Sequence, residues 1–438
     1  MWSTTDSSVS LPEVHGTIPI PLNAGFWRKF FAFAGPGFLV AVGYMDPGNW
    51  ATDLAGGARF GYALLSVVMI SNLMAILLQA LSARLGIASG RDLAQACRDH
   101  YSRPTTIVLW IGCEIAIAAC DLAEVIGSAV ALQLLFGLPL IWGVCLTASD
   151  VLIVLYLQRH GFRYIEAFVL TLIAVIACAF GVELWLSRPD MLAVARGFIP
   201  HASVVTNPDM LYIAIGILGA TVMPHNLYLH SSIVQTRKYT DSVASKREAI
   251  NFASLDSAVA LMSALFINAA ILVMAAAVFH GTGHEDVAEI GQAYRLLAPL
   301  LGTGMASVLF AVALLASGQN ATLTGTLAGQ IVMEGFINIR LRPWLRRLIT
   351  RLLAIVPTIL VVALYGDKGA GPLLILSQVV LSLQLSFAVF PLVQFTSDPT
   401  KMGTFASPRW LKWLAWLTAV VIAVLNAWLL YQVAIGAV

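Results

Sequence analysis

Two four-residue motifs of the sequence contain side chains that could bind a metal ion. The first is Asp-Pro-Gly-Asn at residues 46–49, and the second is Met-Pro-His-Asn at residues 223–226, 177 positions later. Asp46 offers a carboxylate, Asn49 a neutral carbonyl oxygen and Met223 a thioether sulfur. This combination suits a divalent transition metal, because magnesium and calcium prefer shells made of oxygen only. We therefore predict a site for ions such as manganese and iron, with Met223 as the residue that sets its selectivity.

The same motifs predict that two helices are interrupted. Pro47 with Gly48, and Pro224 in the second motif, should each unwind a helix, because proline lacks an N–H and clashes with the carbonyl one turn back. The unwound turns would free the main-chain carbonyls of Gly43 and Ala220 as further ligands. Inside a membrane, such backbone persists only where it lines a cavity or where a ligand satisfies it. Matching interruptions in two halves of a chain are typical of the substrate site of a transporter.

A second group of residues could carry protons. Asp121 and Glu124 lie three residues apart and share one face of a helix, where two close carboxylates in an apolar setting are suited to loading and releasing protons. Arg346 and Arg347 stand at the beginning of a later apolar run and are the nearest basic candidates for partners on the inner side. The alternative is a buried polar pair that only holds helices together.

Other polar residues of the apolar runs are also candidates. His225, beside the second interruption, and His230, about one turn further on, could accept protons because imidazole titrates near neutral pH. Asp150 is a further acid inside an apolar run, and we predict no more than a structural hydrogen bond for it. Asp46 could merely cap the helix that follows it, but acids inside a membrane are functional by default.

The elements that must position these residues are membrane helices. Of the 438 residues, 59% are hydrophobic and 11% are charged, the formal net charge is +2, and the mean hydropathy is +0.84. A soluble domain has roughly 25% charged residues, and a disordered chain has low hydrophobicity and high net charge, so both classes are excluded. A β-barrel would show alternating segments of about ten residues instead of runs of about 20. We predict an all-α polytopic membrane protein with about eleven transmembrane helices, at residues 33–60, 62–86, 106–135, 139–158, 164–186, 209–236, 252–280, 303–338, 343–364, 371–396 and 409–434.

The spans predict two repeats and an orientation. Residues 31–190 hold spans one to five and residues 205–398 hold spans six to ten, and five is odd, so the second repeat must be inverted. Residues 405–438 add an eleventh span. A cytoplasmic N-terminus places 20 of the 25 lysines and arginines on the inner side, as the positive-inside rule requires, and places the C-terminus outside. Residues 1–30 are predicted to be a disordered cytoplasmic tail.

Other kinds of site are not indicated. The five cysteines have no CxxC spacing, which argues against a disulfide framework and against a zinc site. No segment outside the spans is long enough to form a basic domain for nucleic acid.

Three stretches together carry a family resemblance. They are the motif at residues 46–49, the motif at residues 223–226 with Tyr-Leu-His-Ser at 228–231, and the stretch from Gly318 to Gln330. In these stretches the chain resembles the Nramp family of proton-coupled divalent-metal transporters. The resemblance implies a five-plus-five inverted-repeat fold shared with sodium-coupled amino-acid symporters, in an eleven-span form of the bacterial inner (plasma) membrane.

The resemblance also implies a function and a set of residues. It implies uptake of Mn²⁺ or Fe²⁺ with protons. We expect no further cofactor, we expect these ions and the lipid bilayer as partners, and we expect the chain to act as a monomer. The implied metal ligands are Asp46, Asn49, Met223 and the Ala220 carbonyl, joined in some states by Gln378 and Gly43. The implied proton network consists of Asp121, Glu124, Arg346 and Arg347.

Several other functions stay open. A sodium-coupled amino-acid symporter of the same fold would need small or hydroxylated residues at the interruptions, and the pairing of Asp46 with Met223 argues against it. A magnesium importer related to the family would not need the thioether. An intramembrane enzyme would show a nucleophile with its base, or HExxH, on a span, and none is present. A channel is disfavoured, because two inverted broken helices around one acid are typical of an occluding carrier.

Overall fold

The protein is described by a computed structural model, which covers residues 10–12, 14–21, 24–147, 149–150, 156–157, 160–285, 287, 290–339, 343–365 and 370–435. Almost all of its elements are helices. In chain order they are β1 (Ile18–Pro19), α1 (Phe26–Phe33), α2 (Pro36–Gly43), α3 (Pro47–Phe60), α4 (Leu65–Ser89), α5 (Leu93–His100), α6 (Arg103–Phe136), α7 (Leu140–Thr147), α9 (Phe162–Ser187), α10 (Met191–Gly197), α11 (Ser203–Thr206), α12 (Pro208–Thr221), α13 (Pro224–Ile233), β2 (Arg237–Lys238), α14 (Val243–Phe279), α15 (Ile290–Leu301), α16 (Gly304–Ile337), α17 (Pro343–Tyr365), α18 (Ala370–Ser397), α19 (Pro399–Met402) and α20 (Arg409–Ala434).

Within the described ranges, eight helical stretches are long and apolar enough to cross a membrane. The longest, Pro47–Ser89, has 43 residues and is divided into α3 and α4 by a 3₁₀ turn at Gly61–Leu64, where Gly61 has φ +58°. The prediction of a mostly helical chain with several candidate membrane spans is therefore confirmed. Of the predicted span 139–158, α7 is described, whereas residues 148, 151–155 and 158 lie outside the described residues.

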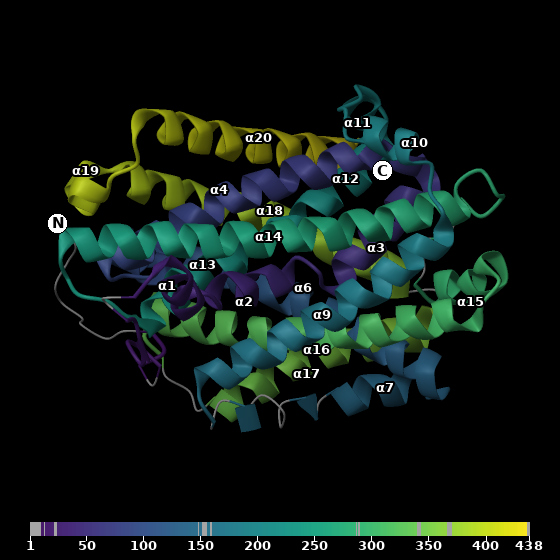
Figure 1. Cartoon of the computed structure of the whole chain (residues 1–438), viewed down its shortest axis with the longest axis horizontal. Helices are drawn as coiled ribbons and strands as arrows, with labels where there is room; N and C mark the ends of the chain where they lie inside the picture. Colours follow the sequence, from purple (N-terminus) through teal and green to yellow (C-terminus); the bar gives the residue numbers. More distant parts are fainter. Residues whose placement is uncertain are drawn as a thin grey trace.

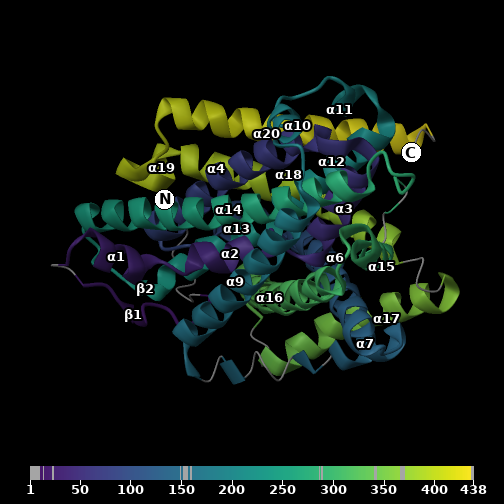
Figure 2. The same cartoon turned by 45° about the vertical axis from the view of Figure 1, so that its right-hand side comes forward.

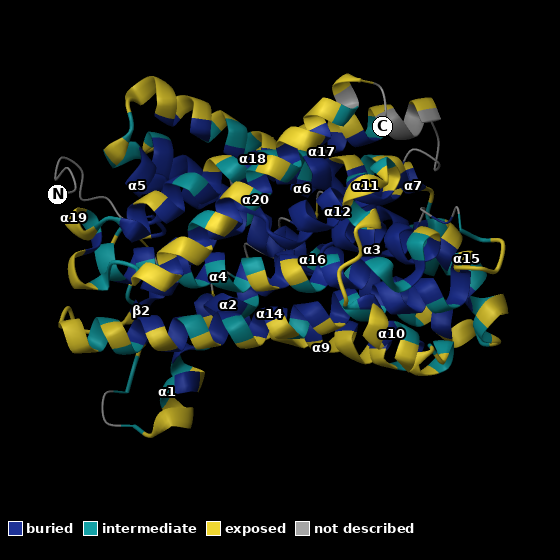
Figure 3. Ribbon diagram, turned by 90° about the horizontal axis from the view of Figure 1, so that it is seen from above, coloured by how far each residue is buried: buried dark blue, intermediate teal, exposed yellow. Residues whose placement is uncertain are grey.

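The long helices run side by side along the long axis of the molecule. In Figure 1, α4, α14, α16 and α20 lie roughly horizontally, with α1 and α19 at one end and α10, α11 and α15 at the other. The stretch that contains α12 and α13 lies at the centre, since 94% of its apolar window is buried, against 33% for α20. Exposed residues gather on the outward faces of the outer helices in Figure 3, and on α20 they include Trp413, Val420 and Val424. Such an apolar outer surface is suited to lipid.

The N-terminal segment differs from the expectation of a disordered tail. Over its described residues, β1 pairs in parallel with β2, and α1 begins at Phe26 (Figure 2). Leu11 and Ile18 are only 2% and 6% exposed. The prediction of disorder was wrong for this part because it rested on local polar composition, whereas the residues that order the segment come from distant parts of the chain.

Candidate functional site

The first interruption lies between α2 and α3. Helix α2 ends at Gly43, and Asp46 caps α3 by accepting the backbone N–H of Asn49 on Oδ1 at 2.8 Å. Pro47 follows the cap at the first helical position, where a missing N–H costs nothing. The sequence therefore stops one helix and starts the next within three residues.

Side chains from other helices satisfy the carbonyls of this interruption. The Tyr44 carbonyl accepts Asn268 Nδ2 of α14 at 2.7 Å. The Met45 carbonyl accepts Trp50 Nε1 at 3.1 Å and Ser317 Oγ of α16 at 2.5 Å. Unpaired backbone groups in a buried setting are costly, so these donors stabilise the non-helical turn.

The second interruption lies between α12 and α13. Helix α12 ends at Thr221, and Met223 occupies the cap position before Pro224, the first residue of α13. Unlike Asp46, Met223 has no side-chain hydrogen bond to the helix it precedes. The Met223 thioether therefore has no part in capping α13 and is available as a candidate metal ligand.

The two interruptions meet at Asn49. Its Nδ2 donates to Asp46 Oδ1 at 2.7 Å, to the Ala220 carbonyl at 3.1 Å and to the Gly43 carbonyl at 3.3 Å. Met223 Sδ lies 3.1 Å from the position that a Cβ on Gly43 would occupy. The second carboxylate oxygen of Asp46 is buried and has no hydrogen-bond partner among the described residues. Three oxygens therefore converge on the Asn49 amide, and the Met223 sulfur lies beside Gly43.

Gln378 lies next to this group. A Cβ on Gly48 would overlap its Nε2, so the Gln378 amide of α18 packs directly on the backbone at the beginning of α3. Gln378 is fully buried, and its Oε1 has no partner among the described residues. The structure therefore brings all six predicted metal-site residues to one place, although Gln378 faces Gly48 rather than Asn49.

Asp121 and Glu124 of α6 both face a glycine of α16. A Cβ on Gly325 would lie 3.1 Å from Asp121 Oδ1 and 3.0 Å from Glu124 Oε1. Glu124 also contacts its own helix, because Cys120 Sγ lies 3.6 Å from Oε1. Cys120 in turn packs with Met223 in one buried cluster, so this cluster connects the carboxylates with the interruption of α12 and α13.

Among the described residues, Arg351 of α17 is the basic partner of Glu124. Its Nη2 lies 3.6 Å from Glu124 Oε2 and 4.0 Å from Asp150 Oδ2, and it donates to Thr322 Oγ1. Arg351 is 2% exposed. The side chains of the predicted partners Arg346 and Arg347 lie outside the described residues.

The two histidines occupy different surroundings. His225 is 1% exposed, and its Nδ1 has no partner among the described residues. His230 Nδ1 lies 3.0 Å from Gln79 Oε1, and Gln79 Nε2 donates to Tyr44 Oη at 2.8 Å. His230 therefore belongs to a polar group that leads back to the first interruption through Tyr44.

The family model described as natural resistance-associated macrophage protein-like (Nramp) matches residues 37–432. This chain belongs to the Nramp family. It is 63% identical over 430 residues to the divalent metal cation transporter MntH of Listeria monocytogenes serotype 4a (strain HCC23). The matched region covers 98% of this chain and 96% of that relative. The solved manganese transporter of Eremococcus coleocola is 44% identical, with a TM-score of 0.90 over 96% of this chain and 90% of that one. The inward-facing structure of Mhp1 shares the fold alone, with a TM-score of 0.59 and 13% identity over 98% of this chain and 96% of that one.

Sequence reasoning missed several polar residues of this Nramp chain. Arg351 is one of the 20 basic residues that the predicted topology places on the inner side, although it lies inside the predicted span 343–364, where a charge is costly. Gln79 and Asn268 lie equally deep in predicted spans. Polar residues in the middle of apolar runs were the signal that could have found all three.

Proposed function

We propose that this Nramp chain is a secondary active importer of divalent transition-metal ions, such as Mn²⁺ and Fe²⁺, coupled to proton entry. The observation that supports it most is the convergence on Asn49 of oxygens from both interruptions, with the Met223 sulfur beside Gly43. This donor set has one carboxylate, neutral oxygens and one thioether, and it suits a borderline metal better than magnesium or calcium. The identity of the chain with proteins named as divalent metal cation transporters supports the same conclusion.

From the hydrogen bonds of Asn49 we infer that the oxygens of Asp46, Gly43 and Ala220 are oriented to bind a cation. The amide N–H₂ of Asn49 is the positive end of a dipole, and it lies among the oxygens of Asp46, Gly43 and Ala220. An arriving divalent ion takes the place of this donor, and rotation of the amide presents Asn49 Oδ1 to the ion. Asp46 supplies the charge that compensates the ion in an environment from which water is excluded.

For the membrane topology we propose eleven spans, with the first and sixth interrupted, in two inverted repeats of five, and a cytoplasmic N-terminus. The stretch Pro47–Ser89 would be about 65 Å long if it were straight, about twice the thickness of the hydrocarbon core, so α3 and α4 count as parts of two spans. Each of α2 with α3 and α12 with α13 then forms one interrupted span. We expect the importer to act as a monomer in the plasma membrane.

For the proton we propose a route through Asp121 and Glu124 that is separate from the metal ligands. Gly325 leaves room for both carboxylates, and the guanidinium of Arg351 lies on the far side of Glu124. A proton on Glu124 would weaken its attraction to Arg351. Protonation and deprotonation of this carboxylate would therefore change how strongly α6 and α17 interact. Asp150 takes part as a second carboxylate near Arg351.

The experiment that tests this function is a proteoliposome assay with metal- and pH-sensitive dyes inside. Asp46→Asn retains a residue that caps helices well, so α3 should still form, but the compensating charge is lost. We expect Mn²⁺ uptake to fall at least 100-fold and Mn²⁺-driven acidification to disappear. The matched control Asp209→Asn changes an exposed acid of α12 and should stay within twofold of the wild type. Full Mn²⁺ uptake by Asp46→Asn would refute the proposed function.

A further inference from the structure

The N-terminal segment makes specific contacts with two separate helical regions. Ser10 Oγ donates to Asp92 Oδ2 at 2.6 Å, immediately before α5, and Gln95 Nε2 donates to Ser10 Oγ at 3.3 Å. The backbone N–H of Leu11 donates to Glu334 Oε2 near the end of α16 at 3.1 Å. Leu11 is 2% exposed and has φ +51°, a conformation that costs a non-glycine residue about 1–2 kcal/mol. Such a conformation persists only where the surrounding contacts impose it.

The same segment then pairs with the chain that follows α13. The N–H of Gly16 donates to the Gln235 carbonyl at 3.0 Å. In the parallel pair of β1 and β2, Ile18 is the partner of Arg237 and Pro19 the partner of Lys238. We call residues 10–12 and 14–19 the N-terminal strap.

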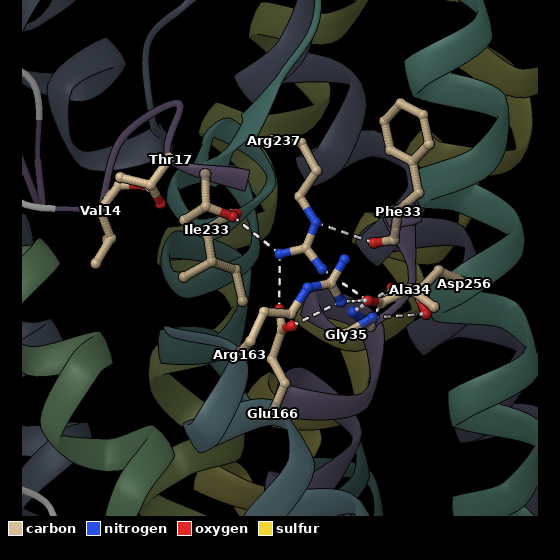
Figure 4. Close-up of polar contacts among 12 residues, drawn as sticks. Val14, Thr17, Phe33, Ala34, Gly35, Arg163, Glu166, Ile233, Arg237 and Asp256 are labelled. Atoms are coloured by element: carbon tan, nitrogen blue, oxygen red, sulfur yellow. Dashed lines mark hydrogen bonds and ion pairs between the residues drawn. The ribbon is translucent and has the colours of Figure 1, made fainter. Parts of the chain in front are cut away.

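The strap pairs with β2 at Arg237, and the side chain of Arg237 hydrogen-bonds to carbonyls at the end of α1. Arg237 is 2% exposed and pairs with Glu166 of α9 at 2.6 Å. It also donates from Nε to the Phe33 carbonyl at 3.1 Å and from Nη2 to the Ala34 carbonyl at 2.7 Å (Figure 4). Arg163 adds a donor to the Ala34 carbonyl at 2.8 Å. Two arginines therefore satisfy carbonyls at the junction of α1 and α2.

The beginning of α2 is held from the other side. Asp256 of α14 accepts the backbone N–H of Gly37 at 2.7 Å and that of Gly35 at 3.3 Å. Gly35 has φ +136°, and a Cβ there would overlap the Glu166 carboxylate. Figure 4 shows these groups converging on Gly35 from separate helices. The junction is thus fixed to α9, α14 and β2 at once.

These contacts join parts that an alternating-access cycle must separate. The strap precedes α1 and α2 of the first proposed repeat, whereas β2, which follows α13, and Glu334 of α16 belong to the second repeat. Its remaining contact, Asp92, lies immediately before α5. Carriers of this type expose their site by moving one group of helices against the other. In this structure Asp46, Asn49 and Met223 are at most 1% exposed, so the strap is docked in a state whose metal site is closed.

We propose that the N-terminal strap is a latch that holds the cytoplasmic side closed, and that it must leave β2 and the α5 and α16 contacts before metal is released inward. This inference rests on the proposed transport function. It predicts a strap that is docked at rest and released once in each transport cycle.

A disulfide across the strand pair tests the latch directly. Pro19→Cys with Lys238→Cys joins two exposed positions that are partners in the β1 and β2 pair, in a background where the exposed Cys145 and Cys178 are changed to Ser. When it is oxidised, we expect the double variant to bind Mn²⁺ within twofold of the wild type but to transport it at least tenfold more slowly. Reduction should restore the rate, and each single variant should transport normally under oxidation. Equal transport rates in the oxidised and reduced double variant would overturn the latch, whereas no uptake by the reduced protein and by the wild type would instead overturn the proposed function.

A labelling experiment follows the strap itself. Leu11→Cys places a thiol at a buried position whose hydrogen bond comes from the backbone, and Thr17→Cys places one at an exposed position of the same strap. A water-soluble maleimide on the cytoplasmic side should label Thr17→Cys quickly under all conditions. It should label Leu11→Cys at least tenfold more slowly at rest, and faster during Mn²⁺ turnover. Equal rates for the two variants at rest, or no acceleration by Mn²⁺, would show that the strap is not a latch.

Discussion

Gly37→Ala tests how the packing of α2 positions the proposed metal site. Gly37 lies in the first turn of α2, and a Cβ there would stand 2.6 Å from both Cα and N of Ser257 and 2.7 Å from the Asp256 carbonyl carbon. These atoms belong to the backbone of the 37-residue helix α14, which cannot rotate away as a side chain could. Carbon atoms need about 3.5–4.0 Å, so α2 must move by about 1 Å.

The displacement should reach the proposed site because α2 is short and straight. It has eight residues, about 12 Å in length, and ends at Gly43, whose carbonyl is one of the oxygens around Asn49. Metal sites tolerate ligand displacements of about 0.2 Å, so a movement of about 1 Å should remove this carbonyl as a ligand. We expect overpacking to cost about 1–3 kcal/mol of stability and Mn²⁺ affinity to fall about tenfold, which corresponds to about 1.4 kcal/mol.

The assay is isothermal titration calorimetry of Mn²⁺ binding on purified protein, combined with thermal unfolding and proteoliposome uptake. The matched control is Gly181→Ala in α9, where a Cβ would meet no atom within 4 Å. The control should bind Mn²⁺ like the wild type. If Gly37→Ala and Gly181→Ala had the same affinity and uptake, the argument that the packing of α2 on α14 positions the Gly43 carbonyl would be wrong.

Three further predictions concern selectivity, charge pairing and pH. Met223→Leu conserves the side-chain volume but removes the sulfur. Mn²⁺ uptake should therefore persist, while discrimination against Ca²⁺ in a competition assay should fall about tenfold or more. Unchanged discrimination would rule out the thioether as the residue group that sets selectivity. Arg351→Gln removes the guanidinium next to Glu124 and should lower the free energy of unfolding by about 3–5 kcal/mol, measured by thermal unfolding. An unaltered melting temperature would contradict the pairing of Arg351 with Glu124. Burial raises the pKa of Asp92, which lies between α4 and α5, to about 6, so the folded state holds this proton more tightly than the unfolded state and stability should fall as the pH rises. Between pH 5 and 7 the free energy of unfolding of the wild type should fall by about 1 kcal/mol because of this group. Asp92→Asn should not show this fall. Equal pH dependence of the free energy of unfolding in both proteins would refute the assignment.

Much of the architecture could be predicted because membrane helices are encoded locally. An apolar run of about 20 residues must form a helix to satisfy its own backbone, whatever it packs against. The prolines at 47 and 224 act in the same local way, and helices begin at both of them. The geometry of the motif is equally local, since its two hydrogen bonds, one of which is the cap of α3, join Asp46 to Asn49 only three positions away.

Contacts between residues far apart could not be predicted in this way. Arg351, whose guanidinium lies 3.6 Å from Glu124, is not among the partners that the sequence predicts, and the side chains of the predicted partners Arg346 and Arg347 lie outside the described residues. The N-terminal strap was predicted to be disordered because its own residues are polar. It is ordered by Asp92, Glu334 and β2, which lie from 82 to 323 residues away in sequence.

The sequence by itself therefore determined the class of the protein, the position of the two interruptions and the kinds of atom that could bind a metal. These properties depend on composition and on neighbours within a few residues. Only the tertiary structure decided that Ala220 and Gly43 share one amide donor, that Gln378 packs on Gly48, and that the strap is docked at one end of the molecule. Helix packing brings such pairs together through many weak contacts summed over the whole fold, and no local pattern records that sum.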